Sequence, residues 1–418
     1  MLRDADVLIL GAGLQGAGVA LELARRGNAV TLIEPEAVAL NRASLRNEGK
    51  IHLGFIYAHD RSLETAFLQL DAALRFRGIV ARWIEPGAEW LGLSTPFHYL
   101  VAHDSIATPE QLSKHYAAVE QRCIEQLAGD RGLDYLGDRP RTLVRALTDR
   151  EVGAHFDPTR FLAGFATAER AIDTDRLAIH LRRAVVGARS VTFAPSHAAR
   201  EIREESDGFR VDGDGPDGAW SVHAHQVVNA TWERRLRFDR QLGIAAPEHL
   251  LHRLKYRVIG RLPRGLRGAP SVSMVLGRYG DVVIRNDGTV YLSWYPAGLR
   301  GWSHDLEPPS DWDSACRGEV EPGLANEIAT AIVAGIEAWY PGMARCEPLL
   351  VDAGAIVAIG RSDVDDGSSG LHVRSHIGVH SRGGYHSVDT GKLTTAPLFA
   401  VRTADRIEAF RRTGSPAS

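Results

Sequence analysis

Cysteine is scarce in this chain of 418 residues, which contains only Cys123, Cys316 and Cys346. The three lie far apart and form no CxxC pair, so the sequence indicates neither a disulfide framework nor a thiolate zinc site. We therefore expect a protein of a reducing compartment, the cytoplasm, that binds no metal.

An excess of charge of one sign is also lacking, because the formal net charge is −3 and no basic run stands out. Proteins that bind nucleic acid or anionic membranes usually carry a basic excess. We expect neither kind of partner.

Long hydrophobic runs are nearly absent, and the one candidate covers residues 7–24. Asp4 and Asp6 precede it, where a signal peptide would carry positive charge, and four glycines and Glu22 interrupt it. This pattern predicts a strand, a tight turn and a helix rather than a targeting or integral membrane segment.

Lysine is rare as well. Of the 49 basic residues, four are lysines, namely Lys50, Lys114, Lys255 and Lys392. We attribute the bias to genome composition, and we note that Lys50 and Lys392 fall within motifs described below.

The order of expected elements indicates the fold class. Residues 5–10, 14–26 and 28–34 predict a strand, a helix and a second strand. Farther on, Asn286-Asp287-Gly288 separates two alternating runs, which predicts a β-hairpin. A glycine-rich loop and a helix from about Leu393 end the pattern. We predict an α/β fold in which a Rossmann-type domain carries an inserted antiparallel β-sheet domain.

A dinucleotide fingerprint lies in the first turn. Its six residues match GxGxxG, and Glu34 ends the second strand at the spacing expected for a ribose-binding carboxylate. The glycines permit a tight turn and close approach to a pyrophosphate, which the amino end of the helix stabilises. The predicted cofactor-binding residues here are Gly11, Gly13, Leu14, Gln15, Gly16 and Glu34. This motif alone does not separate FAD from NAD.

Three further stretches carry a resemblance to a known family. They are the Ser-x-x-Asn-x-Gly-x-Ile-His-x-Gly pattern of residues 44–54, the Val-Val-Asn-Ala-Thr-Trp run of residues 227–232, and the Gly-Lys-Leu-Thr-Thr ending of residues 391–395. Together with the fingerprint they resemble the D-amino-acid oxidase superfamily of FAD-dependent oxidoreductases. That group includes glycine and sarcosine oxidases, flavin glycerol-3-phosphate dehydrogenases and L-2-hydroxyglutarate oxidising enzymes. Trp232 departs from the family, which usually has glycine there.

The resemblance implies a Rossmann-type FAD-binding domain with an inserted antiparallel β-sheet substrate domain. We expect residues 1–80, 145–235 and 345–418 in the FAD domain, and residues 81–144 and 236–344 in the substrate domain. It also implies further FAD-binding residues, with a helix start and Lys392 stabilising the charge on reduced flavin. These residues are Ser44, Asn47, Gly49, Lys50, Gly383, Gly384, Tyr385, Gly391, Lys392, Leu393 and Thr394.

Two residues are candidates for catalysis. His52, in its Ile-His-x-Gly context, resembles a histidine near the flavin in the hydroxy-substrate relatives, and its ordinary pKa suits a general base. It could instead only hydrogen-bond the flavin or carry a covalent link to it. Arg361 resembles in position an arginine that grips a substrate carboxylate, although a surface role is open for it.

Other side chains could line the substrate pocket without a firm assignment. Tyr291, Trp294, Tyr295 and Arg285 belong to the expected hairpin, and His380, Arg382 and His386 flank the glycine loop.

The resulting hypothesis is an FAD-dependent oxidoreductase that transfers hydride from a C–OH carbon of a small polar substrate, a hydroxy acid or polyol type, to flavin N5. Dioxygen or another acceptor would then reoxidise the flavin. An amine or amino-acid oxidase acting on C–N remains an alternative. An NAD-dependent dehydrogenase and a non-catalytic flavin-binding protein are further alternatives. The oligomeric state stays open.

Overall fold

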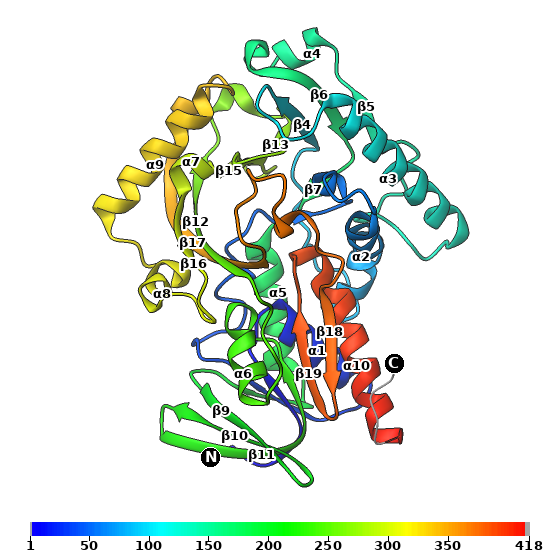
Figure 1. Ribbon diagram of the computed structural model, residues 1–418, viewed down its shortest axis with the longest axis vertical. Helices are drawn as coiled ribbons and strands as arrows, with labels where there is room; N and C mark the ends of the chain where they lie inside the picture. Colours follow the sequence, from blue (N-terminus) through cyan, green and yellow to red (C-terminus); the bar gives the residue numbers. More distant parts are fainter. Residues whose placement is uncertain (1, 414–418) are drawn as a thin grey trace.

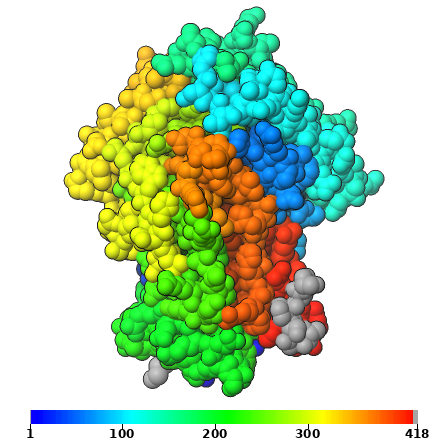
Figure 2. Space-filling view, in the orientation of Figure 1, coloured from blue at the N-terminus to red at the C-terminus, as the bar shows by residue number. Residues whose placement is uncertain are grey.

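The computed structural model describes residues 2–413, which form two lobes (Figure 1). The lower lobe in this view contains both ends of the described chain, and the upper lobe contains the α3 and α9 helices. In the space-filling view, the orange part of the chain runs from the upper lobe down into the lower one (Figure 2). The expected α/β architecture is confirmed.

The lower lobe is built on a sheet in which β1 lies between β11 and β2, and both neighbours run parallel to it. Because β1 is central, its residues from Val7 to Leu10 are completely buried. The strands of this sheet are β1 (Ala5–Leu10), β2 (Val30–Ile33), β8 (Val191–Ala194), β9 (Ala198–Glu205), β10 (Gly208–Gly215), β11 (Gly218–Asn229), β18 (Gly378–Arg382) and β19 (Tyr385–Asp389).

Helices pack against this sheet, and their buried apolar residues share hydrophobic clusters with β1 and β2. Between Gly11 and Gly16 the backbone approach is so close that a Cβ at Gly16 would lie 1.8 Å from the Gly11 carbonyl oxygen. Only glycine permits this strand–helix junction. The helices of this lobe are α1 (Leu14–Arg25), α2 (Glu64–Val80), α5 (Thr174–Gly187), α6 (Arg235–Gln241) and α10 (Ala396–Thr413), which follows the short 3₁₀ helix η8 (Leu393–Thr395).

The upper lobe is built on a second, mostly antiparallel sheet with the order β16-β12-β15-β14-β13-β4-β6-β5, in which β17 also pairs with β12. One face packs against α9, and the other faces the lower lobe. The strands are β4 (Phe97–Ala102), β5 (Val144–Ala146), β6 (Phe161–Thr167), β12 (Leu250–Arg261), β13 (Ser271–Val275), β14 (Asp281–Ile284), β15 (Thr289–Leu292), β16 (Leu299–Ser303) and β17 (Glu347–Ile359). The helices are α3 (Pro109–Gly129), α4 (Asp149–Gly153), α7 (Tyr295–Gly298), α8 (Asp313–Arg317) and α9 (Pro322–Glu337).

A short antiparallel pair, β3 (Lys50–Ile51) and β7 (Arg170–Ala171), lies between the two large sheets. It joins the loop after β2 to the end of β6. The pair therefore fixes the segment that contains His52 against the upper lobe.

Two strands of the upper sheet lie within ranges that the expected division assigned to the FAD domain. β6 and β17 belong to the upper sheet, whereas the expected division assigned residues 145–235 and 345–418 to the FAD domain. The pattern of a buried strand predicts a strand but does not say which sheet it joins, since both sheets bury apolar residues. Among the helices of residues 2–413, none has the length and hydropathy needed to cross a membrane.

Candidate active site

A cavity of about 510 Å³ lies between the two sheets, at the carboxyl ends of β1, β2 and β11. Ligands of open α/β sheets bind at this edge, where the loops after neighbouring strands diverge. The lining runs from Glu34 and His197 at one end to Lys255, Tyr291 and Arg374 at the other. We call these the outer end and the inner end.

The outer end is formed by the predicted fingerprint. Gly11, Gly13, Leu14 and Gln15 line it, and α1 begins there with Gly13 as a cap that offers no side-chain acceptor. Such a helix start presents N–H groups and positive potential to an anion. Gly16 does not line the cavity, and its part is the close packing described above.

Glu34 closes the outer end of the cavity. Its carboxylate accepts hydrogen bonds from the Ala12 N–H at 2.6 Å and the Glu36 N–H at 3.0 Å. Burial raises the pKa of Glu34 to about 7, although these two N–H groups oppose the shift. A donor such as a ribose hydroxyl would therefore find a poorly solvated acceptor.

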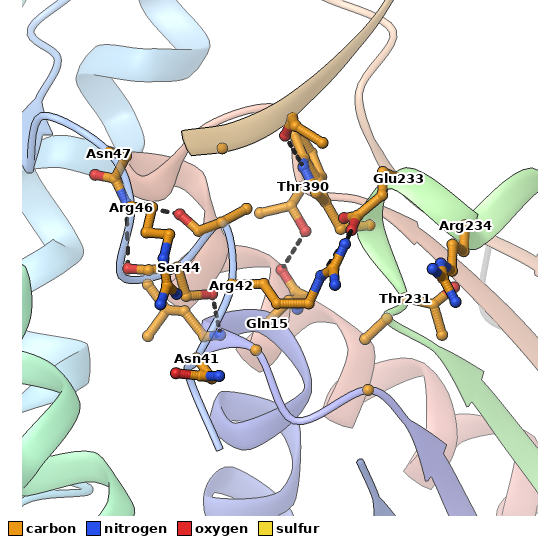
Figure 3. A pocket seen from close by; sticks show the side chains of 18 of the residues that line it. Gln15, Asn41, Arg42, Ser44, Arg46, Asn47, Thr231, Glu233, Arg234 and Thr390 are labelled. Atoms are coloured by element: carbon orange, nitrogen blue, oxygen red, sulfur yellow. Dashed lines mark hydrogen bonds and ion pairs between the residues drawn. The ribbon is translucent and has the colours of Figure 1, made fainter. Parts of the chain in front are cut away.

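The loop after β2 lies along the middle of the cavity (Figure 3). The Leu14 N–H donates to Ser44 Oγ at 2.8 Å, which ties the loop to α1. Asn47 closes the loop on itself, because its Oδ1 accepts from the Gly49 N–H at 2.8 Å. Gly49 has φ +74°, and a Cβ there would lie 2.1 Å from the Ile172 carbonyl oxygen. Ser44 and Asn47 line the cavity, whereas Gly49 supports the loop.

Ion pairs cross the mouth of the cavity. Arg42 donates to Glu233 at 2.9 Å, as Figure 3 shows, and to Asp313 of α8 at 2.8 Å. Arg234 also pairs with Asp313 at 2.8 Å. These contacts join the loop after β2 to both lobes.

The C-terminal segment reaches the cavity from the other side. Gly391, Lys392 and Leu393 line it, and Thr390 contacts Gln15 at 3.3 Å. Thr394 does not line the cavity, but its Oγ1 accepts the His52 N–H at 2.9 Å and so fixes the His52 backbone. Burial lowers the pKa of Lys392 to about 8, with the nearby carboxylate of Glu48 opposing the shift.

His52 lies at the inner end with 1% of its surface exposed, and neither ring nitrogen has a hydrogen-bond partner. Its Nε2 is 3.7 Å from Glu48 Oε1, and its Nδ1 is 3.8 Å from Glu169 Oε1. Burial lowers the pKa of His52, although Glu48 opposes that effect. The ring is therefore neutral near pH 7 and able to accept a proton.

Cations surround the inner end, and some have no close carboxylate. Lys50 pairs with Asp281 at 2.7 Å, while Lys255 is 3.9 Å from the same carboxylate. Within residues 2–413, no carboxylate oxygen lies within 4 Å of a side-chain nitrogen of Arg374 or Lys392. The cavity thus offers Lys255, Arg374 and Lys392 to an anion.

One carboxylate, Glu48, lies among these cations. Burial favours its neutral form, but Lys255 and His52 outweigh burial and hold the pKa of Glu48 well below its usual value. Glu48 is therefore an anion facing the substrate space.

Several predicted residues lie away from the cavity. Arg361 does not line it, because its side chain is 72% exposed and pairs with Glu248 at the surface. Gly383 and Gly384 form the turn between β18 and β19, at the opposite end of the sheet from the cavity. Tyr385 is buried in the core and donates to Asp239 at 2.8 Å. The flavin contacts expected for these three residues, and the substrate contact expected for Arg361, do not fit these positions.

Some of the residues expected to line the substrate pocket lie at the cavity, and others do not. Tyr291 lines the cavity, and the Lys255 Nζ lies 4.8 Å from the centre of the Tyr295 ring. Trp294 packs beside Trp339 in the upper core instead. The remaining four lie outside the lining; they are Arg285, His380, Arg382 and His386.

Sequence reasoning missed Lys255, Arg374, Glu48 and Glu169. A signal for Lys255 existed: three of the four lysines of this arginine-rich chain line the cavity, and the fourth, Lys114, is exposed. Glu48 occupies a variable position of the pattern of residues 44–54, so the pattern gave no signal for it. Arg374 and Glu169 had no signal, because they meet the cavity and His52 only through the tertiary fold.

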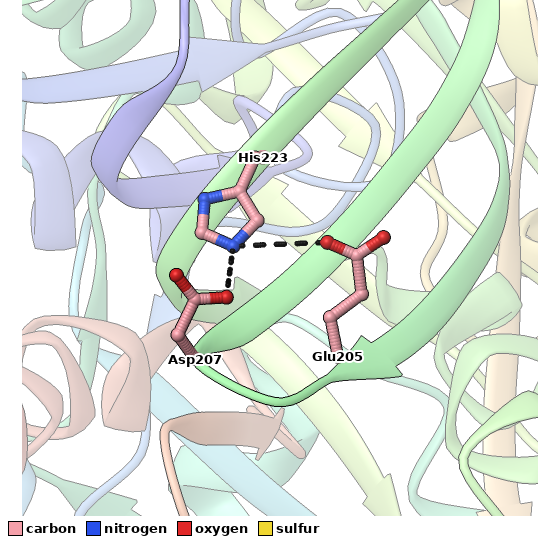
Figure 4. Close-up of side chains that lie close together, drawn as sticks. All are labelled: Glu205, Asp207 and His223. Atoms are coloured by element: carbon pink, nitrogen blue, oxygen red, sulfur yellow. Dashed lines mark hydrogen bonds and ion pairs between the residues drawn. The ribbon is translucent and has the colours of Figure 1, made fainter.

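A group of possible metal ligands lies elsewhere. Glu205, Asp207 and His223 have ligand atoms within 4.8 Å of one another on β9–β11 (Figure 4). Both carboxylates are exposed, and the His223 ring already contacts Asp207 at 3.1 Å. Since this group is far along the sheet from the cavity, it has no part in the site.

The residues present fit FAD. The cavity joins a helix start whose cap residue, Gly13, offers no side-chain acceptor to a cationic inner end. It also contains buried nitrogens of Arg46 and His52 without hydrogen-bond partners. Unpartnered buried polar atoms are rare in native proteins unless a ligand satisfies them. The Gly11–Gln15 turn would hold the pyrophosphate, Glu34 the ribose, and the Thr390–Leu393 segment the flavin end.

Comparison with known proteins identifies the family to which this chain belongs. The family model of DAO FAD-dependent oxidoreductases matches residues 6–406. This chain therefore belongs to the DAO family of FAD-dependent oxidoreductases, and FAD is its cofactor. The family sets aside the NAD-dependent and non-catalytic alternatives.

Solved structures share the fold at low identity. Glycine oxidase from Geobacillus kaustophilus is 17% identical with a TM-score of 0.69, covering 98% of this chain and 95% of its own. L-α-glycerophosphate oxidase from Mycoplasma pneumoniae, solved with FAD bound, is 16% identical with a TM-score of 0.62, covering 97% and 95%. Iminodiacetate oxidase from Chelativorans sp. BNC1 is 18% identical with a TM-score of 0.63, covering 99% and 96%. Among proteins of curated function, no sequence matches this chain.

Proposed function

We propose that this enzyme oxidises the C–OH carbon of a small anionic hydroxy acid or polyol-type substrate, with His52 as the general base. The observation that carries the proposal is the His52 ring, which is buried beside the cavity without hydrogen-bond partners, and whose pKa is lowered by burial. Bound FAD supplies the hydride acceptor. A positioned base that takes the hydroxyl proton accelerates such a reaction by about 10²–10⁴-fold.

The cations of the inner end support the anionic character of the substrate. Lys255 and Arg374 face the same space as His52 and have no carboxylate closer than 3.9 Å within the described chain. Buried cations are stabilised when they pair. A substrate carboxylate or phosphate would supply that partner and place the neighbouring C–OH carbon beside His52.

Oxidation of an amine is the second candidate, and Glu48 favours it. This carboxylate lies on the cavity wall 3.7 Å from His52 Nε2, where it would attract a substrate ammonium. The glycine oxidase and iminodiacetate oxidase structures share the fold.

We also propose that dioxygen or another acceptor reoxidises the reduced flavin. We further propose a cytoplasmic location for the protein, which its three buried free thiols support.

Anaerobic flavin bleaching tests the donor class. The yellow holoenzyme is mixed, without oxygen, with matched pairs of substrates that differ only in OH or NH₂, such as 2-hydroxy acids and the corresponding amino acids. Loss of flavin absorbance with hydroxy acids or polyol phosphates supports the proposal. Bleaching by the amino partners alone would exclude it in favour of the second candidate.

A further inference from the structure

Glu169 is a buried carboxylate near His52 that has no role in the reaction proposed above. It lies between β6 and β7 with 0% of its surface exposed. Its Oε2 accepts the Leu53 N–H at 2.7 Å, and its Oε1 accepts the hydroxyl of Tyr99. Two donors from different elements therefore hold the carboxylate in one orientation.

The register of the short β3–β7 pair places Glu169 opposite His52. Lys50 pairs with Ala171 and Ile51 with Arg170, so the next residues in each direction, 52 and 169, face each other. The distance from Glu169 Oε1 to His52 Nδ1 is 3.8 Å. Catalytic hydrogen bonds are often this loose before substrate binds and tighten in the complex.

His52 is the basic side chain closest to Glu169. Within residues 2–413, His52 is the basic side chain whose nitrogen lies within 4 Å of this carboxylate. A buried carboxylate is stabilised by the hydrogen-bond donors around it. Besides the Leu53 N–H and the Tyr99 hydroxyl, an Nδ1–H of His52 is a donor that would face Glu169.

We propose that Glu169 is a positioning residue that keeps the proton of neutral His52 on Nδ1 and thereby leaves Nε2 free to accept the substrate's proton. The inference rests on the proposed role of His52 as base. When Nε2 takes the hydroxyl proton, the ring becomes an imidazolium whose Nδ1–H points at the Glu169 carboxylate. The positive charge then has a fixed anionic partner, as in other carboxylate–histidine pairs.

The other groups around the ring do not perform this task. Glu48, an anion 3.7 Å from Nε2, attracts the ring proton to that nitrogen and so opposes Glu169. Glu48 lines the cavity, where a substrate hydroxyl would replace it as the partner of Nε2, whereas Glu169 is outside the lining. Lys50 and Lys392 also face His52 and disfavour its charged form. The Tyr57 ring meets the imidazole edge-on at 6.2 Å. Glu169 is thus the acceptor nearest Nδ1 among these neighbours.

Glu169→Gln is the decisive variant because the Leu53 N–H must keep an oxygen acceptor. The amide oxygen of Gln then occupies the Oε2 position, and its NH₂ group takes the place of Oε1 beside His52 Nδ1. An NH₂ group donates to an unprotonated nitrogen. The neutral ring should therefore carry its proton on Nε2 in this variant.

The tautomer is read by ¹⁵N NMR on the FAD-loaded protein with labelled histidines, and a His52→Gln variant assigns the signal. We expect Nδ1–H in the wild type and in Glu48→Gln, and Nε2–H in Glu169→Gln. We also expect kcat of Glu169→Gln to fall about tenfold or more at unchanged flavin content, with a smaller change in KM.

An Nε2–H ring in the wild type, or the same tautomer in the wild type and Glu169→Gln, would overturn the inference. The wild-type spectrum decides the question even if Glu169→Gln does not fold. Because the tautomer is measured without substrate, a failed inference is distinguishable from a failed proposed function, which shows itself in the bleaching test instead.

Discussion

The outer and inner ends of the cavity are built in different ways. The outer end comes mainly from one continuous stretch, Gly11 to Glu34, in which a strand, a turn and a helix follow each other. The inner end combines His52, Lys255, Tyr291, Arg374 and Lys392, which come from parts of the chain that lie far apart. The end that would hold the pyrophosphate and ribose is thus local in sequence, and the end that would hold the flavin and the substrate is a product of tertiary assembly.

Because of this difference, the outer end should control flavin binding and the inner end should control the choice and turnover of substrate. Backbone N–H groups and one carboxylate dominate the outer end, and they suit a cofactor shared by a whole family. Side chains of both lobes dominate the inner end, and they are free to vary with the substrate. Changes at the outer end should therefore alter flavin binding and stability, whereas changes at the inner end should alter turnover at full flavin content.

His52→Gln should give the largest effect of the inner end. Loss of the base lowers the rate of anaerobic flavin reduction by about 10²–10⁴-fold. Stopped-flow absorbance measures this rate, and the absorbance of the oxidised flavin reports its content. His252→Gln is a matched control, because His252 is also completely buried but lies outside the cavity lining. Equal losses in both variants would contradict the assignment of His52.

Gly16→Ala tests the outer end. The new Cβ would lie 1.8 Å from the Gly11 carbonyl oxygen, so the turn must move, at a cost of about 3 kcal/mol or more. Denaturant unfolding should show this loss, and the protein should bind FAD weakly. Gly78→Ala is the control, because a Cβ at this exposed helical position meets nothing within 4 Å, and alanine should stabilise the helix by about 1 kcal/mol. Normal flavin binding by Gly16→Ala would count against the importance of this junction.

Features that depend on neighbours in sequence were predictable, whereas features that depend on tertiary assembly were not. The βαβ unit, the fingerprint and the hairpin around Asn286-Asp287-Gly288 were predictable because each depends on neighbours in sequence. Ser44 and Lys392 required a family resemblance, because their position in the site depends on the fold. Arg374 and Glu169 were not predictable, since an isolated arginine or glutamate carries no local pattern.

The errors have physical causes too. Gly383 and Gly384 were expected at the flavin because glycines permit close backbone approach, but this pair serves a hairpin turn at the far end of β19. Trp232 replaces the usual glycine of the family and nevertheless has φ +52°, a left-handed conformation that favours glycine. Its indole donates to the Ala355 carbonyl at 3.0 Å, which stabilises that conformation.

Glu34→Gln tests the outer end through the pH dependence of stability. The folded-state pKa of Glu34 is raised from 4.5 to about 7 by burial, so the folded apoprotein binds the proton more tightly than the unfolded chain does. Stability from this group is present below pH 4.5 and falls as pH rises to about 7, by about 3 kcal/mol in total. Urea unfolding of the apoprotein at several pH values should show a flatter dependence in Glu34→Gln. An identical dependence in both proteins would show that Glu34 is not the group responsible.

Lys255→Met should have the smallest effect and separates substrate binding from folding within one strand. Arg253, Lys255 and Arg257 alternate on β12 with Leu254, Tyr256 and Val258, which pack in the upper core. Arg253 pairs with Asp363 at 2.7 Å and Arg257 with Asp352 at 2.6 Å, whereas Lys255 stands 3.9 Å from Asp281.

Because the two arginines are already paired, removal of either one breaks a buried ion pair and should lower stability. Asp363 would lose its cation, whereas Asp352 would keep Arg46 at 3.3 Å. Removal of Lys255 should instead raise KM for an anionic substrate about tenfold, because one hydrogen bond to a charged group contributes about 1.5 kcal/mol to binding. The denaturant midpoint of unfolding should stay nearly unchanged. Steady-state kinetics on Lys255→Met, with exposed Lys114→Met as control, measures this change. If KM rises equally for a neutral substrate analogue, Lys255 shapes the cavity but does not select the charge of its ligand.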